Sequence, residues 1–269
     1  MKAIYGVVIF PLLLNYMAYY MDLDYMVSVN VVLGTMTVML LLNGIRVMTR
    51  NDWKLFWGIS LFSNIFTLFV EVIMLKFDVW SFDDSQVRLL GVTLFGAPIE
   101  EYVFWMYCPW LVGACYITLA RGAINSTVNL SYVSVVANRM KILEDKMKSL
   151  VADRVSYTKG DNGKYNRGKK IPVYLSVQII MVAMILFLYK GYKGSLTAML
   201  LTTVMFFFTM MPYEQYAISK GFWVYNESRV IGLFILKVPF EGWLMYIIPP
   251  IAGSMITDYC SRKFFKTNL

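Results

Sequence analysis

Windows of about 20 residues with almost no charge recur along nearly the whole chain. Each window is long enough to cross roughly 30 Å of bilayer hydrocarbon at about 1.5 Å of rise per helical residue. The composition agrees, since 58% of the 269 residues are hydrophobic and only 16% are charged. We therefore predict an all-α polytopic membrane protein with about seven transmembrane helices, at approximately 3–20, 25–45, 55–77, 89–119, 173–190, 194–218 and 230–257.

The first, fourth and seventh windows need separate interpretations. Lys2 followed by an apolar run is also typical of a secretory signal peptide, but the bulky residues 15–21 do not suit a signal peptidase, so we expect a retained helix. The fourth and seventh windows are longer than one span needs. Proline removes a helical hydrogen bond and bends the chain, and we expect bends at Pro98, Pro109, Pro239, Pro249 and Pro250.

Residues 120–172 form the one long polar stretch, with eleven Lys or Arg against four acidic residues. The positive-inside rule predicts that this linker and the N-terminus are cytoplasmic. Within it, 138–153 has the apolar periodicity of a surface helix. A basic face there could contact lipid headgroups, but we favour a solvated loop that only sets the topology. With seven spans, the basic tail 258–269 falls on the outer side, against the same rule. Nothing in the sequence indicates nucleic-acid binding.

The chain contains an internal repeat with an offset of about 143 residues. In the first copy Glu71 is followed by Trp80, Arg88, Gly91 and Pro98-Ile99-Glu100-Glu101. The second copy has the same residue types, and one two-residue gap between its Trp and its Arg brings the spacing into line: Glu214, Trp223, Arg229, Gly232 and Pro239-Phe240-Glu241-Gly242. The predicted organisation is an extra N-terminal helix 1–24, repeat 25–119, linker 120–172, repeat 173–257 and tail 258–269.

Each repeat contains three predicted spans. An odd number of spans predicts two inverted repeats, related by a two-fold axis in the membrane plane, with a site where they meet. The loops carrying Trp80 and Trp223 would then lie on opposite sides of the membrane.

Five carboxyl groups lie within or at the ends of these apolar spans: Glu71, Glu100, Glu101, Glu214 and Glu241. An ionised carboxylate at such depth costs roughly 2.5 to 3.5 kcal/mol or more, so each needs a reason. For Glu71 and Glu214, a structural role with Arg88 and Arg229 is as plausible as a supporting role in a site. Glu100, Glu101 and Glu241 follow helix-bending prolines, and we favour them as catalytic residues.

Aromatic side chains accompany these acids. Helical spacing of four residues places Phe104 on the face of Glu100 and Trp105 on that of Glu101. A desolvated carboxyl group can hold a proton and donate it, and aromatic faces stabilise a nearby cation. This combination suits carbocation chemistry on a hydrocarbon, although Trp and Tyr also form interfacial belts in membrane proteins.

Other chemistries find little support. The chain has no histidine, and its three cysteines lack metal-ligand spacing, so no metal site is expected. There is no Gly-rich dinucleotide or nucleotide motif. We expect no consumed cofactor; a bound flavin or lipid that only shapes the site stays open.

The doubled pattern of Trp, Gly, Pro-x-Glu and following aromatics resembles the lycopene cyclase domain family, integral-membrane carotenoid β-cyclases. The resemblance covers roughly 25–119 and 173–257, and the chain looks like a fused form with both halves. Pro98, Glu100 and Glu101 match the family's first motif fully, whereas Gly242 stands where a second acid could follow Glu241.

The resemblance implies redox-neutral cyclisation of the ψ ends of lycopene, or of γ-carotene, to β-ionone rings. It implies Glu100 or Glu101 as proton donor and Glu241 as proton acceptor or stabiliser of the cation. The partners would be membrane lipids, the carotenoid and other carotenoid enzymes. The expected substrate-binding residues are Pro98, Phe104, Trp105, Pro239, Trp243, Tyr246, Trp80 and Trp223.

Two alternatives stay open. A carotenoid hydratase of the same superfamily would use the same acid but add water to the cation. A proton-coupled transporter with inverted repeats would also place carboxylates within its spans, although the 17 glycines are not clustered at midspan as unwound transporter helices require.

Overall fold

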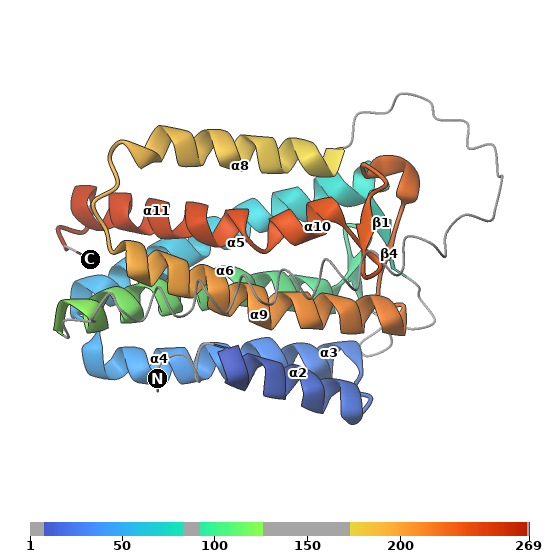
Figure 1. The fold of residues 1–269 in the computed structure, drawn as a ribbon, viewed down its shortest axis with the longest axis horizontal. Coiled ribbons are helices and arrows are strands. Elements are labelled where there is room, and N and C mark those ends of the chain that lie inside the picture. Colours follow the sequence, from blue (N-terminus) through green and yellow to red (C-terminus); the bar gives the residue numbers. More distant parts are fainter. Residues whose placement is uncertain (1–7, 83–91, 126–172, 268) are drawn as a thin grey trace, which may run out of the picture. The chain divides into compact units, whose positions relative to one another are not determined.

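The computed structural model describes residues 8–82, 92–125, 173–267 and 269. The first half begins with α2 (Phe10–Tyr20). A continuous helical span follows, made of α3 (Tyr25–Val29), the short π-helix η2 (Asn30–Gly34) and α4 (Thr35–Val47). The first half ends with α5 (Arg50–Lys76) and α6 (Ile99–Asn125). In the second half come α8 (Val173–Tyr189), α9 (Leu196–Lys220), α10 (Phe240–Met245) and α11 (Ile248–Lys263). These helices run side by side (Figure 1).

Four of the helical segments are long and apolar enough to cross a membrane: Tyr25–Val47, Arg50–Lys76, Ile99–Gly122 and Leu196–Lys220. Their outer faces carry large apolar side chains, such as Phe62 and Phe69 on α5, which are 66% and 63% exposed. The prediction of about seven spans is met in part. The segment Tyr174–Tyr189 is a shorter apolar helix, and the last predicted span is divided between a hairpin, α10 and α11, where Pro249 and Pro250 begin α11.

Both repeats contain the same short hairpin before their last helix. Strand β2 (Thr93–Leu94) pairs with β3 (Ala97–Pro98), and β5 (Phe234–Ile235) pairs with β6 (Val238–Pro239). The registers are equivalent, because Thr93 opposes Pro98 and Phe234 opposes Pro239. Each Pro-x-Glu motif therefore lies where a strand turns directly into a helix. These equivalent elements confirm the internal repeat found in the sequence.

The two repeats are not inverted in the described residues. Strand β1 (Trp80–Ser81) pairs with β4 (Val224–Tyr225), with Trp80 opposite Tyr225. The backbone N–H of Asn226 donates to the carbonyl of Val79 at 2.8 Å, which extends the contact between the two loops. Both Trp-containing loops thus lie at one end of the helices (Figure 1), and the prediction of opposite sides is wrong.

The physical reason lies in where the two repeats are joined. Arg121, near the end of α6, binds Asp52 at the start of α5. Tyr174, at the start of α8, packs instead on Trp80, with ring centroids 5.5 Å apart. The prediction of inversion assumed that the connection begins and ends on one side, and that premise does not hold. Residues 126–172, including the predicted helix 138–153, lie outside the described residues.

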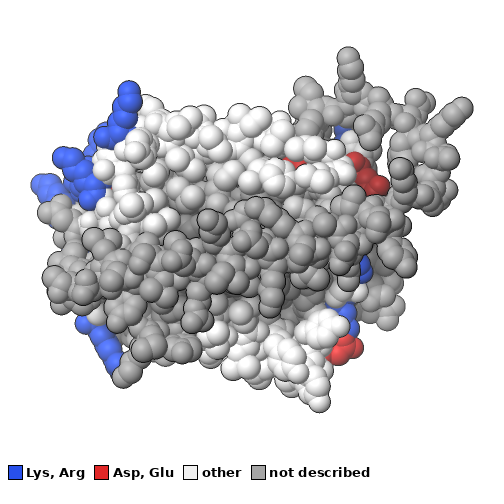
Figure 2. Space-filling view, in the orientation of Figure 1, with Lys and Arg blue, Asp and Glu red and all other residues white. Residues whose placement is uncertain are grey.

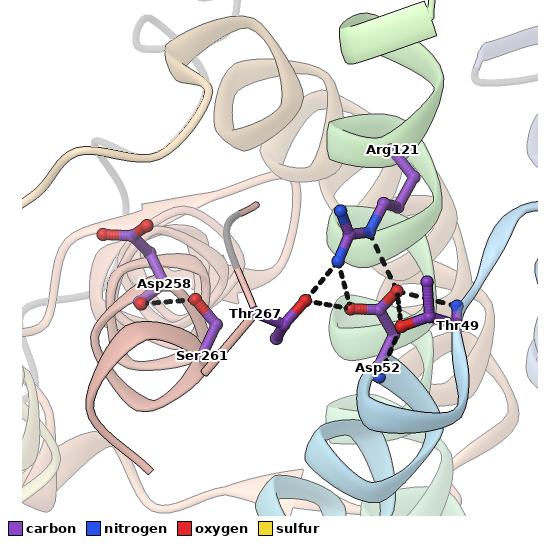
Figure 3. Close-up of polar contacts among 6 residues, drawn as sticks. All are labelled: Thr49, Asp52, Arg121, Asp258, Ser261 and Thr267. Carbon is purple, nitrogen blue, oxygen red and sulfur yellow. Dashed lines mark hydrogen bonds and ion pairs between the residues drawn. The ribbon is translucent and has the colours of Figure 1, made fainter. Parts of the chain in front are cut away.

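The end opposite the Trp-containing loops is held by a buried ion pair (Figure 3). Arg121 donates to both oxygens of Asp52, at 2.8 and 2.7 Å. Thr49 caps α5 through the same carboxylate, and Thr267 of the C-terminal tail donates to it at 2.9 Å. The tail therefore lies at the same end as the 46–54 loop, and not at the opposite end, where a count of seven spans would put it.

Basic residues gather at this end. Figure 2 shows Lys and Arg at the left of the view, where α4 and α11 end. The described residues there include Arg50, Lys54, Arg262 and Lys266, whereas Asp22 and Asp78 belong to the opposite end. We name this the basic end, and the end with β1 and β4 the hairpin end. The conflict between the basic tail and the positive-inside rule disappears once both repeats point the same way.

Impermeant labelling checks this orientation. Single cysteines replacing the exposed Ser81 and Glu227 should be modified from the same face of the membrane, because their loops are paired. Lys266→Cys, at the basic end, should be modified from the other face. All three variants use a background without Cys108, Cys115 and Cys260. Labelling of Ser81→Cys and Glu227→Cys from opposite faces would restore the inverted arrangement.

Candidate functional site

A small cavity lies between the repeats near the hairpin end. Its volume is about 20 Å³, enough for about one water molecule. Two carboxyl groups line it, Glu101 from the first repeat and Glu214 from the second, and the other walls are aromatic. We name this space the central cavity. The described residues that line it are Trp80, Glu101, Phe104, Trp105, Tyr174, Glu214, Trp223, Tyr225 and Tyr246.

Glu71 holds two of these aromatic walls. Its carboxyl oxygens accept hydrogen bonds from the indole N–H of Trp80 at 3.1 Å and of Trp105 at 2.9 Å. An indole N–H can only donate, so both oxygens of Glu71 act as acceptors. The carboxyl group is fully buried. Glu71 therefore joins the loop of β1 to the following helix α6.

Glu214 repeats this arrangement in the second half. It accepts a hydrogen bond from Trp223 at 3.1 Å and one from Tyr246 at 2.5 Å. These donors occupy the repeat positions of Trp80 and Trp105. A third donor, the hydroxyl of Tyr225, lies at 2.8 Å. Arg229, the partner considered from the sequence, is not among these donors.

Glu101 is held by a residue that the sequence did not single out. Tyr25, at the start of α3, donates its hydroxyl to Oε2 of Glu101. The Tyr25 ring is itself buried against Phe222 and Trp223, at centroid distances of 5.0 and 5.6 Å. A tyrosine at the end of an apolar span is typical of an interfacial belt. Nothing in the sequence therefore indicated that Tyr25 binds Glu101.

The other two motif acids point elsewhere. Glu241 is buried and accepts the backbone N–H of Ile231 at 2.5 Å, which ties α10 to the segment before β5. Its second oxygen, Oε2, is buried without a hydrogen-bond partner among the described residues. Glu100 is also buried and borders a separate space beside Trp80 and Pro98. Neither acid lines the central cavity.

Of the remaining residues predicted from the sequence, some line the central cavity and others support the hairpins. Phe104 and Tyr246 line the central cavity, as do Trp80, Trp105 and Trp223. Phe104 lies between Trp105 and Trp223, with centroids 5.3 and 5.8 Å apart. By contrast, Trp243 donates to the carbonyl of Ile235 at 3.2 Å and supports the hairpin. Pro98 and Pro239 end strands β3 and β6 and lead into α6 and α10.

The two halves differ at the position after the first motif acid. In repeat 1 this position is Glu101, which lines the central cavity, whereas in repeat 2 it is Gly242. A Cβ atom on Gly242 would lie 2.6 Å from Cγ1 of Val238. A side chain here would require the side chain of Val238, in strand β6, to shift. The site therefore has one acid of this kind.

The geometry defines a class of protein: a helical membrane protein of two repeats that enclose a buried acid in aromatic walls. A family model described as lycopene cyclase matches residues 24–119 and 170–260, which are both repeats and more than half of the chain. The chain belongs to the lycopene cyclase family, which confirms the resemblance drawn from the motifs. It is thus a carotenoid cyclase-type protein with a lipophilic carotenoid as substrate. No curated protein and no solved structure matches the chain significantly.

Substitution of Gly242 tests this account of the asymmetry. Gly242→Ala should lower the free energy of unfolding by about 1 to 3 kcal/mol, because the added methyl overpacks the contact with Val238. Gly122→Ala is the matched control, since a Cβ there meets nothing within 4 Å. Thermal unfolding in detergent measures both. Equal stability of the two variants would contradict the steric explanation.

Proposed function

We propose that the protein converts the ψ ends of lycopene to β-ionone rings by proton-initiated, redox-neutral cyclisation. One observation carries the proposal: the acid Glu101 lines a cavity whose other walls are aromatic and which lies between the two repeats. Protonation of an alkene needs a strong, desolvated acid, and the resulting cation needs electron-rich walls and no bulk water. The central cavity combines these properties.

Glu101 is the best-placed proton donor. Two carboxyl groups, Glu101 and Glu214, line the central cavity, and no Lys or Arg is among the described residues that line it. A third, Glu71, binds the indole groups of its walls Trp80 and Trp105. All three cannot be ionised together at low cost in such an environment. Glu71 and Glu214 accept two and three hydrogen bonds from neighbouring side chains, and such donors stabilise negative charge. We therefore assign the proton to Glu101, with Tyr25 as the residue that positions it.

The steps balance without an oxidant or reductant. Glu101 gives its proton to the terminal alkene, whose electron pair forms the new C–H bond and leaves a tertiary cation. The neighbouring double bond then attacks this cation and closes a six-membered ring, which moves the positive charge into the ring. Loss of a ring proton restores a double bond. The product is an isomer of the substrate, so no consumed cofactor is proposed.

Glu214 is proposed as the group that stabilises the cation and takes the final proton. It is the other carboxyl group on the central cavity, and it comes from the other repeat. Glu71 positions Trp80 and Trp105 and does not itself line the cavity. The sequence favoured Glu100, Glu101 and Glu241 for catalysis. The contacts of Glu241 instead favour a structural role at the hairpin end.

A carotenoid hydratase is the second candidate. The central cavity has room for about one water molecule beside two carboxyl groups. Such a water could add to the cation before the neighbouring double bond closes the ring. Cyclase and hydratase share the first proton transfer. They differ in the mass and ring content of the product.

The positive-inside rule supports a cytoplasmic position for the basic end, with Arg50, Arg262 and Lys266. The central cavity lies near the opposite end of the helices. We therefore propose a multi-pass cell-membrane protein whose substrate approaches from within the bilayer.

Incubation with lycopene in D₂O tests the reaction. Purified protein in liposomes should form γ- or β-carotene that carries one non-exchangeable deuterium per ring, because the initiating proton comes from an exchangeable carboxyl group. Chromatography and mass spectrometry give ring content and mass. A heavier acyclic product containing the elements of water would assign the hydratase. Unchanged lycopene would refute both.

Replacing Glu101 by glutamine tests the proton donor. Glu101→Gln can still accept from Tyr25 but cannot donate an acidic proton, and turnover should fall at least about a hundredfold. The matched control is Glu241→Gln, whose amide oxygen can still accept from Ile231. This control should lose stability rather than turnover, since its NH₂ group would stand at the unpartnered Oε2 position. An active Glu101→Gln would exclude Glu101 as the donor.

A further inference from the structure

An apolar groove adjoins the central cavity. It has a volume of about 230 Å³ and lies among α5, α6, α8, α9 and the α10–α11 segment. Trp105 and Tyr246 line both the groove and the central cavity. Each of these two side chains is bound to a carboxyl group, Glu71 and Glu214 respectively. Within the described part of the chain, only these two side chains are common to both linings, so they form the wall between the groove and the central cavity.

The lining shows what kind of ligand the groove can take. No charged side chain is among the described residues that line it. The hydroxyl of Thr67 donates to the carbonyl of Asn64 at 3.0 Å, and that of Thr257 donates to Gly253 at 2.7 Å. These threonines satisfy their hydroxyls on their own helices, as polar groups in apolar surroundings must. The groove therefore suits a hydrocarbon without polar groups.

The groove is also elongated and open to the side. From Trp105 to Gly113 on α6, and from Pro249 to Thr257 on α11, it follows eight residues, or about 12 Å at about 1.5 Å per residue. At its rim, Phe62 and Phe66 of α5 are 66% and 39% exposed. A straight chain could thus enter from the lipid side and lie along the helices.

We propose that this groove binds the unreacted polyene arm of the substrate while its end is in the central cavity. The inference rests on the proposed function and deepens it. The central cavity, at about 20 Å³, holds about one water molecule, so a substrate end enters only when a wall moves. Trp105 and Tyr246 are the side chains that separate it from the hydrocarbon in the groove. The arm then extends from them toward the basic end.

Filling the groove tests the proposal. Ser63→Phe and Thr67→Phe each place a ring into the groove from α5. Leu61→Phe is the matched control, because Leu61 is 65% exposed on the same helix and does not line the groove. Each protein is produced in a lycopene-accumulating bacterium, and bound pigment per mole of purified protein is read from visible absorbance. Both groove variants should lose at least about tenfold in bound carotenoid, substrate and product together, equal to about 1.4 kcal/mol, while Leu61→Phe should match the wild type.

A second substrate separates this inference from the reaction itself. A short acyclic terpene with the same alkene end needs the central cavity but not the groove, so Ser63→Phe should still turn it over. If the wild type cyclises neither substrate, the proposed function fails, while the pigment measurement still reports on the groove. Groove variants that bind lycopene like the wild type would overturn the inference. So would equal pigment loss in Leu61→Phe, or a co-purified lipid in the groove that lycopene does not displace.

Discussion

Two buried carboxyl groups, Glu71 and Glu214, organise the part of the structure on which the site depends. A carboxyl group in an apolar bundle needs hydrogen-bond donors, because the free-energy cost of burying it unpaired exceeds the stabilisation that most packing contacts provide. Each of these acids finds a Trp nine residues later in its own loop and an aromatic donor on the following helix. Their bonds set the positions of the aromatic walls. These hydrogen bonds hold Trp80, Trp105, Trp223 and Tyr246 in place around the central cavity.

The near-symmetry of the two repeats makes their differences informative. Both halves carry a hairpin, a Pro-x-Glu motif and a carboxyl–aromatic network in equivalent places. Only the first half adds an acid, Glu101, and Gly242 is held small by Val238 in the second. One repeat therefore supplies the proposed proton donor, and the other supplies the more heavily hydrogen-bonded carboxylate, Glu214. An acid and a base with different surroundings are what a proton-initiated reaction requires.

Much of the candidate site was visible in the sequence, because the doubled spacing from Glu to Trp to Pro-x-Glu is unusual. Trp80, Phe104, Trp105, Trp223 and Tyr246 were all named from it and all line the central cavity. The division of roles among the acids was not visible. Glu100 and Glu101 are neighbours in the chain, but neighbouring residues on a helix point in different directions. Tyr25 was missed because it comes from a different helix, and no local spacing links it to Glu101.

The sequence by itself determined the helical membrane character, the repeat and the identity of the acids, since hydropathy and residue spacing are properties of the chain alone. The orientation of the repeats depended on tertiary structure. Three spans per repeat predict inversion only if the connection begins and ends on one side, and the pairing of β1 with β4 shows that both repeats point the same way. Which carboxyl groups face the cavity was likewise decided by packing, because a buried acid turns toward whichever donors the fold brings near it.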